Sequence, residues 1–256
     1  MPDDLPPAIP AATLILFDES DSGAARHIML ERAAGMVFAP GMRVFPGGRI
    51  DPQDHSLADT ASLLRGRAED AEDAVARIAA IRETLEETGI AIAIRPAPTA
   101  QTIIAWRAAL KSHQPFAPLL AAGRHVLDLS LLTPFARWVP NFSAPRRFDT
   151  RFYIARCEGV TAAIHDEDEA SRTIWLSAAD ALGGQTAGRH NFIFPTMCNL
   201  ARLAAYPSFT QVQAHLAETP VQTIVSDLRD INGVKHDCIP EDAGYPITCA
   251  PTMTRG

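Results

Sequence analysis

The chain has 256 residues, of which 47% are hydrophobic and 21% are charged, which is enough to bury a sizeable core in one large domain or two small ones. Its net charge of −7, without a compensating basic run, argues against a general nucleic-acid-binding protein. No apolar run approaches the roughly 20 residues that span a bilayer, and the acidic, proline-rich opening is not typical of a signal or transit peptide. We therefore expect a soluble cytoplasmic protein with no membrane partner.

The first predicted elements are two short apolar strands at 11–17 and 26–32, which flank a polar turn and predict a hairpin. A further extended stretch at 42–51 is interrupted by Pro46-Gly47-Gly48. About twenty polar residues without a regular pattern then separate this stretch from the next element.

A helix is predicted over 68–88, because this segment lacks proline and glycine and is rich in alanine, glutamate, arginine and leucine. Gly89 follows at the position where a left-handed glycine commonly ends a helix. Apolar residues recur at helical spacing and predict one buried stripe, which consists of Ala71, Val75, Ile78 and Leu85.

The rest of the chain alternates helices and strands without a regular strand–helix–strand rhythm, so we expect an α/β (α+β) fold with a mixed sheet between helical layers. Helices are predicted at 99–112, at 115–123, from Ser177, at 194–208, and from Ser208, which forms a capping box with Gln211. Strands are predicted at 135–140, 146–157, 173–176 and 221–227, and the remaining tail after Pro220 is expected to be irregular.

Four scattered cysteines, Cys157, Cys198, Cys238 and Cys249, form no CxxC motif. In a chain of this size they predict reduced thiols in a reducing compartment, not a disulfide framework. Cys238 lies two residues from His236, but this spacing fits no zinc ligand set.

Three carboxylates, Glu83, Glu86 and Glu87, fall on the last turn of the predicted helix, away from the buried stripe. A helix already carries partial negative charge at this end, so the cluster is unfavourable unless a cation offsets it. Gly47 and Gly48 allow the backbone to approach a ligand closely. Carboxylates and a glycine carbonyl are hard oxygen ligands that suit Mg²⁺ or Mn²⁺, and such ions bind phosphates readily. The alternative is a solvated acidic face without a ligand.

FPGGR at 45–49 and RETLEETGI at 82–90 resemble the signature of the Nudix hydrolases, and this resemblance implies the Nudix α/β/α sandwich. That signature is a glycine, five residues, a glutamate and seven residues, followed by Arg-Glu, an apolar residue, any residue, Glu-Glu, any residue, a glycine and an apolar residue. Thr84 stands in the first of the two apolar positions.

A larger departure from the signature is an insertion of about 20 residues, placed at roughly 49–68, because Gly48 and Arg82 are 34 positions apart instead of fourteen. Counting back from Arg82, the first glutamate of the signature falls at Ala74. Either Glu72 or Asp73 serves in its place, or no residue does.

Such an insertion is similar to that of a Nudix branch that includes the peroxisomal coenzyme A diphosphatases. Gly41 before FPGG, LTPFARWVPN, RRFDTRFYIA, the DEDEASRTIWLSAADAL loop and HNFIFPTMCNLARLA also resemble this branch, whereas Val37 replaces an expected arginine. The resemblance covers most of the chain. It implies a single domain over 1–256, with a helical insertion at about 99–130 and a helical or irregular C-terminal region at about 190–256.

The resemblance also implies a role for each matching residue. Glu83 and Glu87 are expected to be the main metal ligands, with Glu86 on a second ion or a bound water and the Gly47 carbonyl as a further ligand. Glu169, in the acidic loop before a predicted strand, is the candidate general base. The remaining assignments are Arg82 to orient Glu86, Gly89 to end the helix, and Arg43, Gly48, Arg146 and Arg147 to bind substrate.

Three functions remain open from the sequence. The first is hydrolysis of a diphosphate in a small nucleoside diphosphate derivative, with coenzyme A or acyl-coenzyme A first and ADP-ribose or an NADH-type dinucleotide next. The second is a Nudix domain that binds such a ligand as a sensor without cleaving it. The third, an acidic protein-interaction helix, leaves Pro46-Gly47-Gly48 unexplained. A homodimer is also left open.

Overall fold

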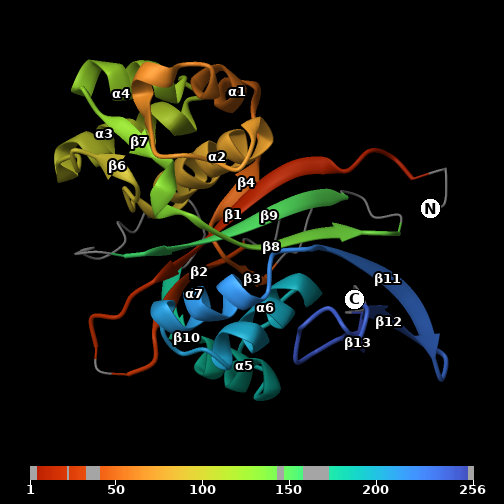
Figure 1. The fold of residues 1–256 in the computed structure, drawn as a ribbon. Coiled ribbons are helices and arrows are strands. Elements are labelled where there is room, and N and C mark those ends of the chain that lie inside the picture. Colours follow the sequence, from red (N-terminus) through yellow and green to blue (C-terminus); the bar gives the residue numbers. More distant parts are fainter. Residues whose placement is uncertain (1–4, 22, 33–40, 143–146, 158–172, 253–256) are drawn as a thin grey trace.

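A seven-stranded mixed sheet separates two groups of helices in the computed structural model, which describes residues 5–21, 23–32, 41–142, 147–157 and 173–252 (Figure 1). The strand order is β13-β12-β11-β8-β9-β1-β4, and these strands are β1 (Ile9–Phe17), β4 (Gly47–Arg49), β8 (Thr133–Pro140), β9 (Phe148–Arg156), β11 (Thr223–Ile231), β12 (Val234–Cys238) and β13 (Cys249–Pro251). The predicted mixed sheet between helical layers is thereby confirmed.

Strand β1 lies at the centre of the site-bearing part of this sheet. It pairs in parallel with β9 over its whole length and antiparallel with β4, where Thr13 lies opposite Gly47. Because side chains alternate along a strand, Leu14 and Leu16 pack on one face of the sheet and Ile15 and Phe17 on the other. All four side chains are almost completely buried.

The hairpin predicted for the first two strands is wrong. Strand β2 (Arg26–Glu31) lies between β10 (Thr173–Ser177) and β3 (Arg43–Val44) in a separate three-stranded sheet. Only one antiparallel bridge, between Asp18 and Arg26, joins the ends of β1 and β2. One edge of β1 is paired with β9 over its whole length, and the other edge is paired with β4 at Ala11–Thr13, so β2 pairs instead with β10 and β3.

One helical group covers the face of the sheet that carries Leu14 (Figure 1). It consists of α1 (Pro52–Ala58), α2 (Ala71–Thr88), α3 (Ala100–Lys111) and α4 (Phe116–Gly123), with a small sheet of β5 (Leu64–Arg65), β7 (Val126–Asp128) and β6 (Ile94–Arg95). Helix α2 is buried at every position over 75–82, because α1 and α3 pack against it. The buried surface is therefore wider than the predicted stripe, and Ala71, which was predicted to belong to that stripe, is exposed.

Helices α5 (Ala178–Thr186), α6 (Phe194–Ala204) and α7 (Phe209–Glu218) form the second group, against the Ile15 face. Two of the caps predicted from the sequence are present. The Ser177 hydroxyl accepts a hydrogen bond from the Asp180 amide, and the Ser208 hydroxyl accepts one from Gln211. Trp138 is buried in this core.

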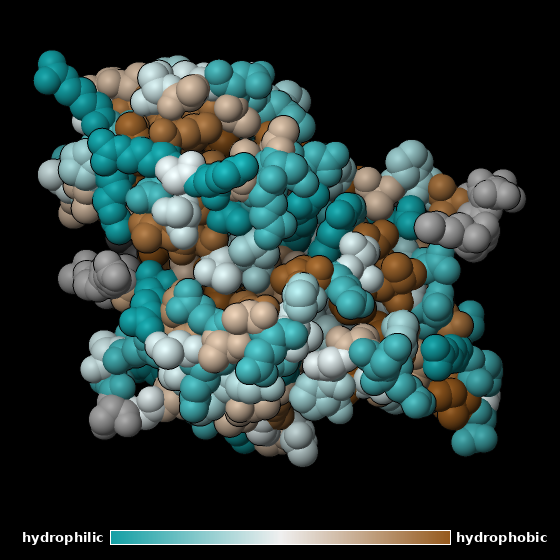
Figure 2. Space-filling model, viewed as in Figure 1, coloured by the Kyte–Doolittle hydropathy of each residue, from teal (hydrophilic) through white to brown (hydrophobic). Residues whose placement is uncertain are grey.

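The C-terminal region contains more regular structure than the sequence predicted, because β11 extends beyond the expected strand and continues into β12 and β13. Register places Cys238 opposite Cys249, and these two residues form a disulfide, which corrects the prediction of four reduced thiols. Hydrophobic surface is exposed over this region in Figure 2, where the exposed apolar residues are Val225, Leu228, Ile231 and Val234. Within the described ranges, no helix is long and apolar enough to cross a membrane.

Candidate active site

Helix α2 begins at Ala71, three residues later than predicted, ends at Thr88 as predicted, and carries the three glutamates on its last turn. The Asp70 carboxylate caps the N-terminus by accepting a hydrogen bond from the Asp73 amide at 2.7 Å. Gly89 ends the helix in the left-handed conformation, with φ of 72°, and its amide donates to the Leu85 carbonyl. The carboxylates therefore project from a helix end whose position is defined on both sides.

The glycine pair of β4 lies directly against two of these carboxylates. The Gly47 amide donates to Glu87 Oε2 at 2.9 Å. A Cβ atom on Gly48 would lie 2.4 Å from the carboxylate carbon of Glu83, and one on Gly47 would lie 2.4 Å from the Ala12 carbonyl oxygen. A larger residue at Gly47 would displace the backbone of β1, so this position requires glycine, whereas a larger residue at Gly48 would displace the Glu83 carboxylate. The Gly47 contact uses its amide, and its carbonyl as a metal ligand stays a prediction.

Arg82 has closer partners than Glu86, the one predicted. Its guanidinium is buried and forms a two-pronged ion pair with Asp54 of α1, with Nε–Oδ1 and Nη2–Oδ2 distances of 2.8 Å. Its Nη1 donates to Glu83 at 2.8 Å, whereas the nearest Glu86 oxygen is 3.8 Å away. Arg82 therefore orients Glu83 more directly than Glu86, and Asp54 holds Arg82.

Asp54 also lies at the signature position where the sequence comparison found no acid. It follows Gly48 after five residues, which is the spacing of the first signature glutamate, so the extra residues lie after this acid instead of before it. Glu72 is exposed and pairs with Arg151, and Asp73 is buried against Arg77 and Tyr153. Neither replaces the signature acid. Helix α1 was not predicted, although the pattern Asp51-Pro52-x-Asp54, with proline at the first helical position, is a sequence signal for it.

Thr84 fits the apolar position of the signature because its hydroxyl is satisfied within the helix. The side chain is fully buried, and Oγ1 donates to the Ala80 carbonyl at 2.7 Å. Thr88 does the same one turn later, toward the Thr84 carbonyl. Threonine therefore packs here as a small apolar residue without leaving a polar atom unpaired.

Two carboxyl groups at the end of α2 have pKa values well above the ordinary value for glutamate. Burial raises the pKa of Glu83 to about 7 and outweighs the opposing effect of Arg82, and the charges of Glu86 and Asp54 add smaller increases. Burial and then the charge of Glu83 raise the pKa of Glu87 to about 8, against the Gly47 amide and the positive charge of Arg32. Arg32, just after β2, is a cation near this site that sequence reasoning missed.

Comparison with known proteins identifies this arrangement. Residues 65–203, which are more than half of the chain, match the family model of the NUDT19 Nudix domain. The chain belongs to the Nudix hydrolase family. It is 26% identical over 249 residues to "Putative nudix hydrolase 7" of Caenorhabditis elegans, across 92% of this chain and 74% of that protein. The crystal structure of a NUDIX hydrolase from Alicyclobacillus acidocaldarius aligns with a TM-score of 0.71 and 27% identity, over 81% of this chain and 96% of that one.

Nudix hydrolases generally use divalent metals, and the donor chemistry at the end of α2 fits such an ion. Glu83, Glu86 and Glu87 supply carboxylate oxygens only, which favours Mg²⁺ or Mn²⁺ over softer metals. Among the described residues, no group of three or more His, Cys, Asp or Glu side chains is already gathered around a metal position. Glu83 contacts Arg82, and Glu87 contacts Gly47.

The raised pKa values predict how the stability of this Nudix protein depends on pH without metal. Between about pH 6.5 and 8 the folded protein keeps protons on Glu83 and Glu87 that the unfolded chain has released, so the free energy of unfolding falls as pH rises. Buried His27, whose pKa burial lowers to about 4, gives the opposite trend only below about pH 6.5. We expect the melting temperature in EDTA to fall as the pH rises through this window. The increase in melting temperature that Mg²⁺ causes should become larger over the same window.

The matched control for this pH dependence is the double variant Glu83→Gln/Glu87→Gln. Its melting temperature in EDTA should vary less with pH over the same window, because neither side chain can then titrate. Thermal melts of both proteins by circular dichroism measure the difference. The same downward slope in the double variant would assign the effect to other groups.

The predicted substrate residues of the Nudix site do not all come together. Arg43 forms an ion pair with Glu31 at 2.9 Å and donates to the Arg189 carbonyl, so its guanidinium is largely engaged within the protein. Arg147 donates to the Pro140 carbonyl at 2.7 Å and to the Pro6 carbonyl at 2.9 Å, where it ties the N-terminal segment to the β8–β9 end. Arg146, Glu169 and Val37 lie outside the described residues.

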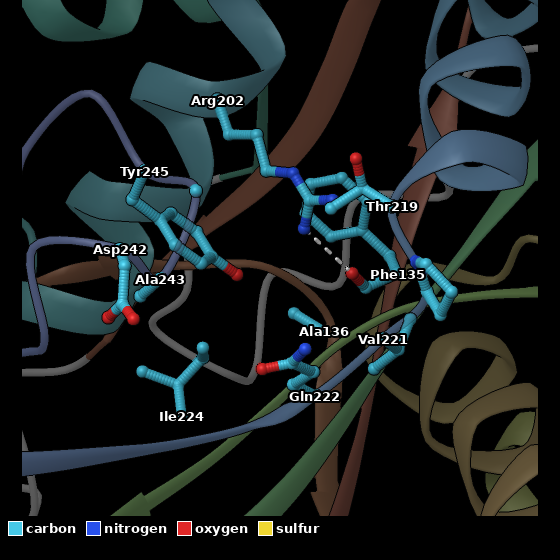
Figure 3. Close-up of a pocket in the computed structure, with 12 residues that line it drawn as sticks. Phe135, Ala136, Arg202, Thr219, Val221, Gln222, Ile224, Asp242, Ala243 and Tyr245 are labelled. Carbon is cyan, nitrogen blue, oxygen red and sulfur yellow. Dashed lines mark hydrogen bonds between the residues drawn. The ribbon is translucent and has the colours of Figure 1, made fainter.

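A pocket in the described part of the chain is separate from the Nudix glutamates. It is lined by residues of β8, α6, β11 and the C-terminal segment, and none of its lining residues belongs to α2 or β4. Arg202 lies over the rings of Phe135 and Tyr245 and donates to the Phe135 carbonyl (Figure 3). The position of this pocket, away from the glutamates, therefore does not support a role in diphosphate binding.

Proposed function

We propose that this Nudix hydrolase cleaves the diphosphate of a nucleoside diphosphate linked to another group, with coenzyme A or acyl-coenzyme A as substrate and Mg²⁺ or Mn²⁺ as cofactor. The observation that carries the proposal is the close approach of the β4 glycine pair to Glu83 and Glu87 on the last turn of α2. Glycines beside hard carboxylate ligands let the backbone come close to a metal ion and to a phosphate group bound to it.

Each side chain has a role in this proposal. Glu83 and Glu87 are the residues that would hold the metal ion, with Glu86 on a second ion or a bound water. When bound, the ion would neutralise charge on the phosphate oxygens as the P–O bond breaks. Arg32, whose positive charge reaches Glu87, is the cation we expect to face the diphosphate. Glu169 stays our prediction for the base that takes a proton from the attacking water.

In the proposed reaction, the oxygen of water is added to one phosphorus and the bridging P–O bond breaks. Coenzyme A would then yield 3′,5′-ADP and 4′-phosphopantetheine, or its acyl form. Support for this substrate comes from the insertion and from the segments that resemble the coenzyme A branch. A 3′-phosphate needs a cationic partner, for which a guanidinium fork is well suited. We retain Arg146 for this role and withdraw Arg147, whose donors contact backbone carbonyls.

The test compares coenzyme A, 3′-dephospho-coenzyme A, ADP-ribose and NADH, each with Mg²⁺ and with excess EDTA. We expect hydrolysis only with metal, and a preference for the 3′-phosphorylated compound. Arg146→Ala should reduce that preference about tenfold or more, because a hydrogen bond to a charged group contributes about 1.5–3 kcal/mol. Arg147→Ala is the matched control and should keep the preference.

Three outcomes would contradict parts of this proposal. Undiminished hydrolysis in EDTA would exclude the metal role of the glutamates. Equal rates on coenzyme A and its dephospho form, or faster cleavage of ADP-ribose, would exclude coenzyme A as the preferred substrate. No release of any phosphate-containing product, with metal binding intact, would favour a domain that only binds its ligand.

A further inference from the structure

A buried arginine from another helix contacts the end of α2. Arg107, on α3, is only 6% exposed, and its Nε donates to the Glu86 carbonyl oxygen at 3.1 Å. Its Nη2 donates to the Glu87 carbonyl oxygen at 3.2 Å. One guanidinium therefore joins the backbone of two glutamates that the proposed function assigns to metal binding.

These two carbonyls are ones that the helix cannot satisfy by itself. The last four carbonyls of an α-helix have no amide partner within the helix, and here the Gly89 amide takes only that of Leu85. Arg107 also places a positive charge at the negative end of the α2 dipole, beside the acidic cluster. The sequence showed that a cation was needed here, but not that a side chain of the chain itself supplies part of it.

Arg107 is held in place by the packing of its own helix. Its neighbour Trp106 is buried and makes edge-to-face contacts with Phe116 of α4 and with His125, at centroid distances of 5.9 and 5.1 Å. Leu110, one turn further, is also buried in the same core. The face of α3 that carries Arg107 is therefore fixed against the rest of the helical group.

We propose that Arg107 is a positioning residue that holds the last turn of α2 so that the Glu86 and Glu87 side chains stay in the orientation that binds the metal ion. The inference rests on the proposed function, and it assigns a role in that site to the helical insertion. The planar fork matters, because it reaches two carbonyls at once, whereas a lysine in its place would keep the charge but lose the fixed geometry of the two contacts.

The decisive variant is Arg107→Lys, which preserves the charge and changes only the fork. Calorimetric titration of Mn²⁺ into the full-length protein measures the metal affinity without depending on activity. We expect Arg107→Lys to weaken Mn²⁺ binding about tenfold or more, in the range found when a residue that orients metal ligands is replaced. With coenzyme A as substrate, the Mg²⁺ concentration for half-maximal rate should rise by a similar factor.

Arg77→Lys provides a matched control on the same helix. Arg77 is also buried, pairs with Asp73 at 2.7 Å, and donates to the carbonyls of Leu129 and Leu132, but it lies toward the other end of α2. This variant should lower the melting temperature while keeping wild-type Mn²⁺ affinity. Titrations are run well below the melting temperature of each variant, and Arg107→Gln replaces Arg107→Lys if the latter does not fold.

The outcomes separate this inference from the proposed function. Wild-type Mn²⁺ affinity in the folded Arg107 variant would overturn the positioning role, because the fork would then contribute to folding alone. An equal loss of affinity in Arg77→Lys would overturn it as well. If the wild type binds Mn²⁺ but hydrolyses none of the compounds, the proposed function fails while the Mn²⁺ titrations still decide the role of Arg107. If the wild type binds no Mn²⁺, both fail.

Discussion

Replacement of Glu87 by glutamine should lower kcat/KM by about 10³ or more, since the charge stabilisation that a bound metal supplies is several kcal/mol and about 4 kcal/mol corresponds to a factor of 10³. The fold should remain intact, because the amide oxygen of glutamine can still accept the hydrogen bond from the Gly47 amide. The metal-free variant should be at least as stable as the wild type above neutral pH, because burial disfavours the Glu87 charge.

Glu72→Gln is the control for this substitution. Glu72 lies on the same helix, but its side chain is 79% exposed and contacts only Arg151 among the ion pairs of the described residues. The same loss of charge at this position should leave kcat/KM and the Mg²⁺ dependence unchanged. Near-normal turnover in Glu87→Gln would show that the metal is held by other residues.

Replacement of Asp54 by asparagine should destabilise the protein by about 3–5 kcal/mol, because it removes the only fully buried carboxylate among the partners of the Arg82 guanidinium in the described residues. Both side chains of this pair are at most 2% exposed, so water cannot substitute for the lost carboxylate. Activity should fall further than stability alone explains, because Arg82 also contacts Glu83. Urea unfolding measures the first effect, and kcat/KM well below the unfolding transition measures the second.

Asp149→Asn gives a comparison in which the geometry is similar and the burial differs. Asp149 accepts two hydrogen bonds from Arg137, at 2.8 and 2.6 Å, but the two side chains are 23% and 34% exposed. Solvent screens this pair, so its loss should cost about 1 kcal/mol or less. A loss of similar size in both variants would mean that burial does not explain the contribution of the Asp54–Arg82 pair.

Local patterns in the sequence predicted the elements and part of the site. The C-terminal end of α2 at Gly89 and the serine caps of α5 and α7 depend on residues a few positions apart, and the candidate site residues were predicted from a recurring signature. Propensity, capping and hydrophobic spacing act over this range, so the sequence alone reports them. The sequence alone also showed that three carboxylates at the C-terminal end of α2 repel one another and need a cation nearby.

Tertiary structure alone decided which distant groups meet at that end. Asp54 reaches Arg82 from 28 positions earlier, and Arg107 reaches the Glu87 carbonyl from 20 positions later. The pairing of β2 with β10 and the meeting of Cys238 with Cys249 are likewise set by which edges and registers remain available after folding. A sequence shows which charged side chains and strand edges need partners, but several segments of the chain offer suitable partners for each. The packing of α1 and α3 around α2 selects among them, because a buried charge is stable only where its partner is buried with it.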